Sequence, residues 1–278
     1  MKTSAPLLIT ASLDSGKTPY VALSSTSARV EAYMEGLLAW CREPWVGSIV
    51  FAKNCSARIR PEILVHAAAS HGKKLELVQV NSSPRTLLQG KGFGEGDMIL
   101  QALEKSETLR GADDFIKITG KLFCPGTEQL LRGEGGGDFF LAQHHFQDRV
   151  LSIRRWVSPL YRSERGSRVM AFLKRPMRVP WGLIAASSSA LVDTRLYRVN
   201  RDFYLEVLSG AYLRVQDALG YTLEHAFHDD LRGSIGSVRM MEISPGIIGV
   251  SGSVGTRAGE FSEEIRAEAR DLAARLLI

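Results

Sequence analysis

The chain has 278 residues, of which 45% are hydrophobic and 23% are charged, as is usual for a globular protein. This length allows one large α/β domain, and no apolar run approaches the roughly 18 residues of a membrane-spanning helix. The net charge of +5 is unevenly spread, because residues 149–178 contain nine basic residues and a single acidic one, Glu164. Such a band suggests a phosphate-rich partner, and a solvated arginine-rich surface explains it equally well.

The first half of the chain alternates between strand and helix patterns. The apolar residues predict strands and helices in the order Leu7–Leu13, Ser27–Arg42, Ser48–Ala52, Arg60–His71 and Leu75–Val80. A glycine-rich segment, a helix over Met98–Leu109 and a strand over Phe115–Thr119 follow. This order predicts an α/β fold with a mostly parallel central sheet and helices on both faces.

The second half is less regular. We expect an apolar strand ending at Phe140, a turn or short strand over Leu183–Ala190 and a strand and loop over Ser244–Val254. Helical spacing predicts three late helices over Asp202–Leu219, Thr222–Leu231 and Phe261–Leu276. No long linker interrupts the chain. We therefore expect a single domain over residues 1–278, with a ligand-binding half at 1–125 and a second half at 126–278.

The chain has three widely spaced cysteines, Cys41, Cys55 and Cys124. Their odd number and spacing are typical of reduced thiols and match no metal site. The apolar start, LLITASL, ends at Asp14 and Gly16 and is interpreted as a strand rather than a leader peptide. We expect a cytoplasmic protein and leave open a contact with the inner face of the membrane through residues 149–178.

The glycine-rich segment Gln89–Asp97, QGKGFGEGD, is a candidate phosphate site. Its glycines, including Gly92 and Gly94, would let backbone amides turn toward an anion, and the following helix would add its positive end. Lys91 could contact a phosphate, and Glu95 could orient a sugar hydroxyl or Lys91 itself. The segment matches neither a P-loop nor a dinucleotide fingerprint, and a flexible glycine turn is the alternative.

The strand Phe115–Thr119 contains a lysine and is followed by Thr119-Gly120-Lys121. Ligands bind beyond the carboxyl ends of parallel strands, so we expect these three residues at a ligand site. Gly120 would allow close approach, and Lys121 would supply a cation. Lys117 shares a face with Thr119 and needs an anionic partner, for which Asp113 or Asp114 are the candidates.

The segment Gly220–Asp230 offers titratable groups on one predicted helix. Glu224, His225 and His228 fall within one turn, and Glu224 and His228 share a face. This arrangement could be a general base with a helper or a metal pair, and an ordinary surface helix is an equal alternative. The preceding motif DTRLY, Asp193–Tyr197, contributes Asp193 and Arg195 as further candidates.

Several motifs together resemble a group of bacterial proteins similar to the glycosyltransferase A fold enzymes of capsule and lipopolysaccharide assembly. The motifs are TASLD, the stretch Ser25–Tyr33, IVFAKN, KGFGEG, FIKITGK, DTRLY, the LEH helix and GVSGS. The resemblance covers most of the chain and implies a Rossmann-like fold that transfers a sugar from a nucleotide-sugar donor to a glycan or lipid-linked acceptor. It also implies that Ser12 and Arg29 belong to the donor site and that Glu224 acts as the base, with Asp193 and His225 beside it.

One motif of metal-dependent enzymes of that fold is missing. They usually carry Asp-x-Asp at the end of a central strand, where this chain has Thr119-Gly120-Lys121. We therefore expect no cofactor and no divalent metal, with Lys91, Lys121 and Arg195 neutralising the leaving diphosphate instead.

Two other functions remain open. A sugar-phosphate nucleotidyltransferase would share the fold, but it should have its glycine-rich loop directly after the first strand, and residues 11–18 match that only in part. A non-enzymatic module that binds a polyanion or membrane surface would use the basic stretch 149–178. Its basic residues have few aromatic neighbours, and we expect no nucleic-acid partner.

Overall fold

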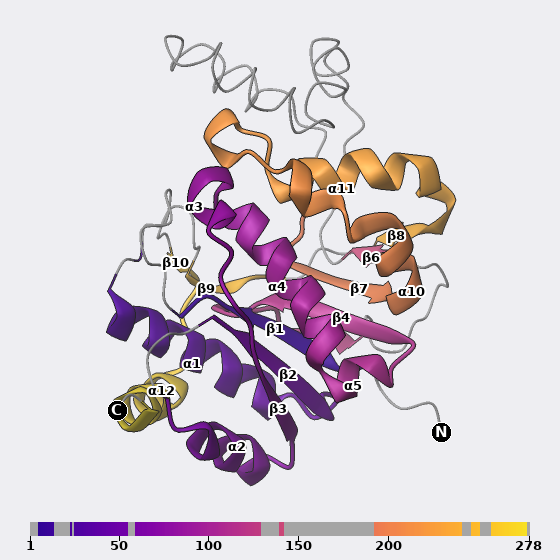
Figure 1. Cartoon of the computed structure of the whole chain (residues 1–278). Helices are drawn as coiled ribbons and strands as arrows, with labels where there is room; N and C mark the ends of the chain where they lie inside the picture. Colours follow the sequence, from indigo (N-terminus) through magenta and orange to yellow (C-terminus); the bar gives the residue numbers. More distant parts are fainter. Residues whose placement is uncertain are drawn as a thin grey trace.

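A computed structural model gives the fold of the chain (Figure 1). The structure describes residues 5–13, 23, 25–54, 59–128, 139–141, 192–240, 246–250 and 257–276. The basic stretch 149–178 and the predicted turn at 183–190 lie outside these residues, as does most of the expected strand and loop at 244–254.

The described residues form a central sheet of seven strands in the order β3-β2-β1-β4-β7-β6-β8. They are β1 Leu7–Ala11, β2 Ser48–Lys53, β3 Lys74–Gln79, β4 Asp114–Thr119, β6 Phe139–Leu141, β7 Leu196–Asn200 and β8 Val238–Met240. β3, β2, β1 and β4 are mutually parallel, whereas β7 runs antiparallel to both of its neighbours. The predicted α/β class with a mostly parallel sheet is confirmed.

Helices cover both faces of the sheet, as the buried strands require (Figure 1). One face carries α1 Thr26–Arg42, α2 Pro61–Ser70 and α12 Glu263–Leu276. The other carries α4 Lys91–Lys105, α5 Glu107–Arg110 and α11 Leu223–Leu231. Successive residues of β1 alternate between the two cores: Leu7 and Ile9 face α1, and Leu8 faces α4. The same alternation places Lys117 of β4 on the α4 face, beside Phe115.

The prediction of a glycine-rich loop is wrong, because α4 begins at Lys91 and includes Gly92, Gly94 and Gly96, while Gly90 precedes the helix. The short helix α3, Arg85–Gln89, precedes it. A Cβ on Gly96 would lie 2.2 Å from the Cβ of Tyr212, and one on Gly94 would lie 2.8 Å from a methyl of Thr86. Glycines cost helical stability, roughly 1 kcal/mol each, but here they let neighbouring segments lie directly against the helix. The predicted helix over Met98–Leu109 is likewise corrected, because α4 ends at Lys105 and Glu107–Arg110 forms α5.

The predicted continuous helix over Asp202–Leu219 is also wrong. The segment breaks into α10 Arg201–Phe203, the π-helical turn η1 Tyr204–Leu208 and the 3₁₀ turns η2 Ala211–Arg214 and η3 Asp217–Leu219. Contacts with α3 hold this path, since the side chain of Gln89, the last residue of α3, donates to the carbonyls of Leu213 and Val215, at 3.2 and 3.1 Å. The two helices predicted after this segment are confirmed as α11 and α12.

A second, small sheet joins β5 Leu122–Phe123, β9 Ile248–Val250 and β10 Arg257–Ala258. It fixes the turn that follows β4, because Gly249 lies against the backbone of Lys121. No helix in the described part of the chain is both long and apolar enough to span a bilayer.

Candidate functional site

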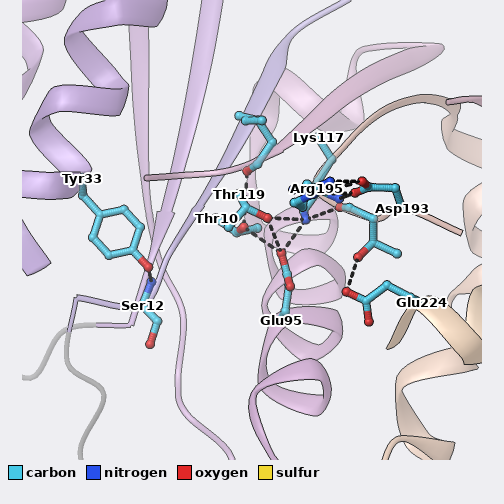
Figure 2. A network of polar contacts seen from close by, with 11 residues as sticks. Thr10, Ser12, Tyr33, Glu95, Lys117, Thr119, Asp193, Arg195 and Glu224 are labelled. Carbon is cyan, nitrogen blue, oxygen red and sulfur yellow. Dashed lines mark hydrogen bonds and ion pairs between the residues drawn. The ribbon is translucent and has the colours of Figure 1, made fainter. Parts of the chain in front are cut away.

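The candidate site lies at the carboxyl edge of the parallel strands. β1 and β4 end side by side, with Thr10 in register with Thr119. Because β7 runs the other way, the segment 192–195 that leads into it reaches the same edge, where the Arg195 carbonyl accepts from the Thr119 amide at 2.9 Å. The structure thus brings residues from both halves together, as Figure 2 shows: Thr10, Ser12, Tyr33, Glu95, Lys117, Thr119, Asp193, Arg195 and Glu224.

A polar network around Lys117 forms the centre of this site. The Lys117 side chain is 0% exposed and forms an ion pair with Glu95 of α4, whose side chain is 26% exposed. Its ammonium also donates to the Thr194 carbonyl at 2.7 Å and to the Thr119 hydroxyl at 3.1 Å. The predicted partners were therefore wrong, since Asp114 pairs with Arg198 instead. Because this partner comes from α4, the sequence around Lys117 could not predict it.

Glu95 collects several donors at its partly exposed end. The hydroxyls of Thr119 and Thr10 donate to its Oε1 at 3.1 and 3.4 Å. Burial raises the pKa of a carboxyl group, but the charge and hydrogen bond of Lys117, with Lys91 further away, outweigh burial and lower the pKa of Glu95 below its usual value. Glu95 is thus an ionised carboxylate beside the end of β4.

Lys121 lies beside this network within a group of cations. It is 2% exposed, and its ammonium lies 5.5 Å from the centre of the Tyr33 ring. Burial, the Arg29 guanidinium and Lys91 lower the pKa of Lys121 to about 8. Arg29 is also buried, and its guanidinium donates to the carbonyls of Ser12 and Leu23. These residues bring positive charge to the edge of the sheet where an anionic ligand was expected.

The glycines predicted at the donor site have close neighbours within the chain. A Cβ on Gly120 would lie 2.7 Å from the Thr10 carbonyl oxygen, and one on Gly92 would lie 3.2 Å from a carboxylate oxygen of Asp217. Packing thus accounts for both glycines, and a role for them or for Gly94 in ligand binding stays a prediction.

Asp217 was missed by the sequence reading and occupies the start of α4. Its carboxylate accepts from the amide of Gly92 at 3.0 Å, which satisfies a donor at the positive end of the helix. Burial raises the pKa of Asp217 to about 6, and the hydrogen bond from Gly92 and the charge of Lys91 only partly offset that effect. The expected phosphate site at the start of this helix is thus already filled by a carboxylate of the chain. No local motif could have indicated this contact, because 125 residues separate the two groups.

The predicted catalytic residues lie on the other side of Lys117. The Glu224 carboxylate accepts from the Thr194 hydroxyl at 3.3 Å, and the Thr194 carbonyl in turn binds Lys117. Asp193 is buried and forms an ion pair with Arg195, whose side chain is 42% exposed. Asp193 therefore fixes one side of the Arg195 guanidinium, and the Arg195 side chain remains partly exposed to solvent.

The two histidines of α11 have different surroundings from Glu224. The Nδ1 atom of His225 accepts from the amide of Thr222 at 3.1 Å and contacts its hydroxyl at 2.9 Å, closing a capping box at the start of the helix. His228 is fully buried, whereas Glu224 is half-buried. Within the ranges that the structure describes, no cluster of three or more His, Cys, Asp or Glu residues could hold a metal ion.

No model of a protein family matches the chain, and no curated protein matches its sequence. The fold matches 56 solved chains, among them three that align with most of its length. The first is a CMP:2-keto-3-deoxy-manno-octonic acid synthetase complexed with CTP, with 14% identity, a TM-score of 0.40 and coverage of 98% of this chain and 99% of the other.

The second is the apo structure of the bifunctional glycosyltransferase WbbM, with 12% identity, a TM-score of 0.42 and coverage of 87% of this chain and 39% of the other. The third is a UTP-bound UGPase from Acinetobacter baumannii, with 11% identity, a TM-score of 0.39 and coverage of 96% and 92%. At these identities and TM-scores the similarities carry no argument about the activity of this chain.

Proposed function

We propose that the chain is a glycosyltransferase that moves a sugar from a nucleotide-sugar donor to a glycan or lipid-linked acceptor. The observation that supports this most is the presence of both cations and a carboxylate at one edge of the sheet. The charges of Arg29 and Lys91 act on Lys121 there, and the half-buried carboxylate of Glu224 is linked to the Lys117–Glu95 pair through Thr194. Transfer to a hydroxyl needs both kinds of group: cations for a departing diphosphate and a base for the attacking oxygen.

In this proposal the donor diphosphate lies against Lys121 and Lys91, near Ser12 and the end of β4. Arg29 contributes its positive charge without contacting the diphosphate, because its guanidinium already donates to two carbonyls. Arg195 reaches the same edge with its exposed end. Glu95, whose side chain is partly exposed, accepts hydrogen bonds from sugar hydroxyls of the donor.

The chemical step follows from these positions. The acceptor oxygen attacks the anomeric carbon, Glu224 takes the proton of that hydroxyl, and the bond from the anomeric carbon to the phosphate oxygen breaks. The electron pair of that bond stays on the diphosphate, where the lysines stabilise it. Asp193 acts by holding Arg195, and His225 by fixing the start of the helix that carries Glu224.

The proposal includes that no divalent metal is required, because the cations replace it beside the diphosphate. The anticipated contact of residues 149–178 with an anionic membrane face stays a prediction, as does the cytoplasmic location. The acceptor is described only by its chemistry, a hydroxyl on a glycan or on a lipid-linked sugar.

A ligand screen tests the donor side of this proposal. We expect UDP, CDP, ADP or GDP to raise the melting temperature of the protein in the presence of EDTA. Lys121→Met and Lys91→Ala should abolish that shift, whereas Lys74→Ala should preserve it, because Lys74 is exposed and starts β3 at the opposite edge of the sheet. A shift that requires Mg²⁺ or Mn²⁺ and vanishes with EDTA would contradict metal-free binding.

A second assay distinguishes the enzyme classes. The protein is incubated with the matching nucleotide sugars and oligosaccharide acceptors, and released nucleoside diphosphate is measured. Release of pyrophosphate from a nucleoside triphosphate and a sugar 1-phosphate, with no transfer from nucleotide sugars, would instead establish a nucleotidyltransferase.

A further inference from the structure

The surroundings of Lys121 differ from those of the other buried lysine of the site. Lys117 has a carboxylate partner and two neutral acceptors. For Lys121, the contact found among the described residues is the face of the Tyr33 ring, and no carboxylate in that part of the chain forms an ion pair with it. Among the described residues, this buried ammonium has a ring beside it and no counter-charge, so it has lost most of its hydration without a compensating ion pair there.

The charged groups around Lys121 make its protonation harder still. From α1 it faces Arg29 and Tyr33, and both cations lie within 6 Å of the same ring. From α4 it faces Lys91 and Glu95. The Glu95 carboxylate accepts hydrogen bonds from Lys117, Thr119 and Thr10 rather than from Lys121. β1 and β9 bring no titratable side chain to it, because their sequences are LLITA and IGV.

A bound phosphate would reverse this balance. Its negative charge would stabilise the ammonium form of Lys121 and offset the repulsion from Arg29 and Lys91. The pKa of about 8 in the unliganded protein means that a proton can be exchanged near neutral pH.

We propose that binding of a phosphate group at this site is coupled to the uptake of one proton by Lys121. The inference rests on the proposed function, since it requires that the diphosphate lies against Lys121. The balance is simple: the neutral amine takes a proton from the solvent, and the resulting ammonium pairs with the phosphate oxygen. No covalent bond is formed or broken. The site therefore binds a phosphate group more weakly as the pH rises, although the ligand keeps its full negative charge.

The size of the effect follows from the same equilibrium. With a free pKa of about 8, roughly 0.8 proton should be taken up on binding at pH 8.5 and about 0.1 at pH 7. The affinity should fall about tenfold between pH 7 and pH 9. The terminal phosphate of a nucleoside diphosphate loses its last proton near pH 6, so the ligand itself adds little to this change.

Isothermal titration calorimetry with UDP, CDP, ADP and GDP tests the coupling. Each titration is run at pH 7.0 and 8.5 in two buffers of different ionisation enthalpy, and the difference in heat gives the number of protons taken up. Lys121→Arg keeps a cation that cannot lose its proton. This variant should still bind but take up no proton, and its affinity should be independent of pH. Lys74→Arg is the control and should behave as the wild type.

The outcomes separate the inference from the function on which it rests. If a diphosphate binds without proton uptake at pH 8.5, or if Lys121→Arg retains the uptake, the coupling is refuted while the donor site survives. If no diphosphate binds at either pH, the proposed function fails and the inference fails with it. Should Lys121→Arg not fold, the pH dependence of uptake by the wild type decides alone.

Discussion

The buried pair of Lys117 and Glu95 should stabilise the fold asymmetrically. Glu95→Gln leaves the Lys117 ammonium without a counter-charge at a position with 0% exposure. Removing one partner of a buried pair costs about 3–5 kcal/mol, and we expect about 3 here because Thr194 and Thr119 still accept from the ammonium. Lys117→Met leaves a carboxylate that is 26% exposed and bound by two hydroxyls, so we expect a loss of only about 2 kcal/mol.

The double variant completes a thermodynamic cycle. With neither charge present, the loss should be about 2 kcal/mol, which gives a coupling free energy of about 3 kcal/mol between the two side chains. Urea unfolding at pH 7, followed by circular dichroism, measures all four proteins. The pKa of Glu95 is lowered in the fold, so its contribution is present above its ordinary value of 4.5 and is lost as the pH falls below it.

A surface pair provides the matched control. Arg42 and Glu268 lie 2.8 Å apart, with side chains 27% and 37% exposed, and their coupling should stay below about 1 kcal/mol. If the Lys117–Glu95 coupling is no larger than this, or if Lys117→Met costs more than Glu95→Gln, the description of the buried network is wrong.

Three further predictions concern other parts of the site. The pKa of Asp217 is raised from 3.8 to about 6, so the free energy of unfolding should fall as the pH rises between these values. Asp217→Asn should therefore be more stable than the wild type at pH 7 by up to about 3 kcal/mol. Parallel curves of stability against pH for the two proteins would contradict this. Gly96→Ala should cost at least about 1–3 kcal/mol, because its Cβ would overlap Tyr212, whereas Gly111→Ala should be tolerated in the same thermal melt, its nearest neighbour being 3.5 Å away. Glu224→Gln should lower turnover about 10²–10⁴-fold while diphosphate affinity, measured by calorimetry, stays unchanged; near-normal turnover would remove Glu224 from the mechanism.

The strands and most helices could be predicted because their signal is local. β1, β2 and β4 are short, mostly apolar runs bounded by turn residues, as expected of strands that are buried on both faces, whereas the edge strand β3 alternates apolar and polar residues. The direction of β4 followed from the parallel pattern. This direction places Thr119 and Lys121 at the carboxyl edge of the sheet, where the structure also has them.

The parts that failed depend on contacts between distant segments. Glycines in QGKGFGEGD have high intrinsic loop preference, and only the presence of Tyr212 and Asp217 against them explains why they are helical. The partner of Lys117 is likewise supplied by α4, so the nearby Asp113 and Asp114 were plausible but irrelevant. A sequence shows which residues need a partner, but here it does not show which element supplies one.

The reversed direction of β7 also determines how the chain could be divided. Because β7 pairs with β4, a fragment ending near residue 128 would leave Phe115, Ile116 and Ile118 on an unprotected strand at the edge of the sheet. The same fragment would deprive Lys117 of its acceptor on Thr194. Expressed alone, it should self-associate, and only coexpression with the remaining residues would restore a soluble pair. Any split reporter or circular permutant made from this protein should therefore keep β4, β7 and the residues between them on one uninterrupted segment.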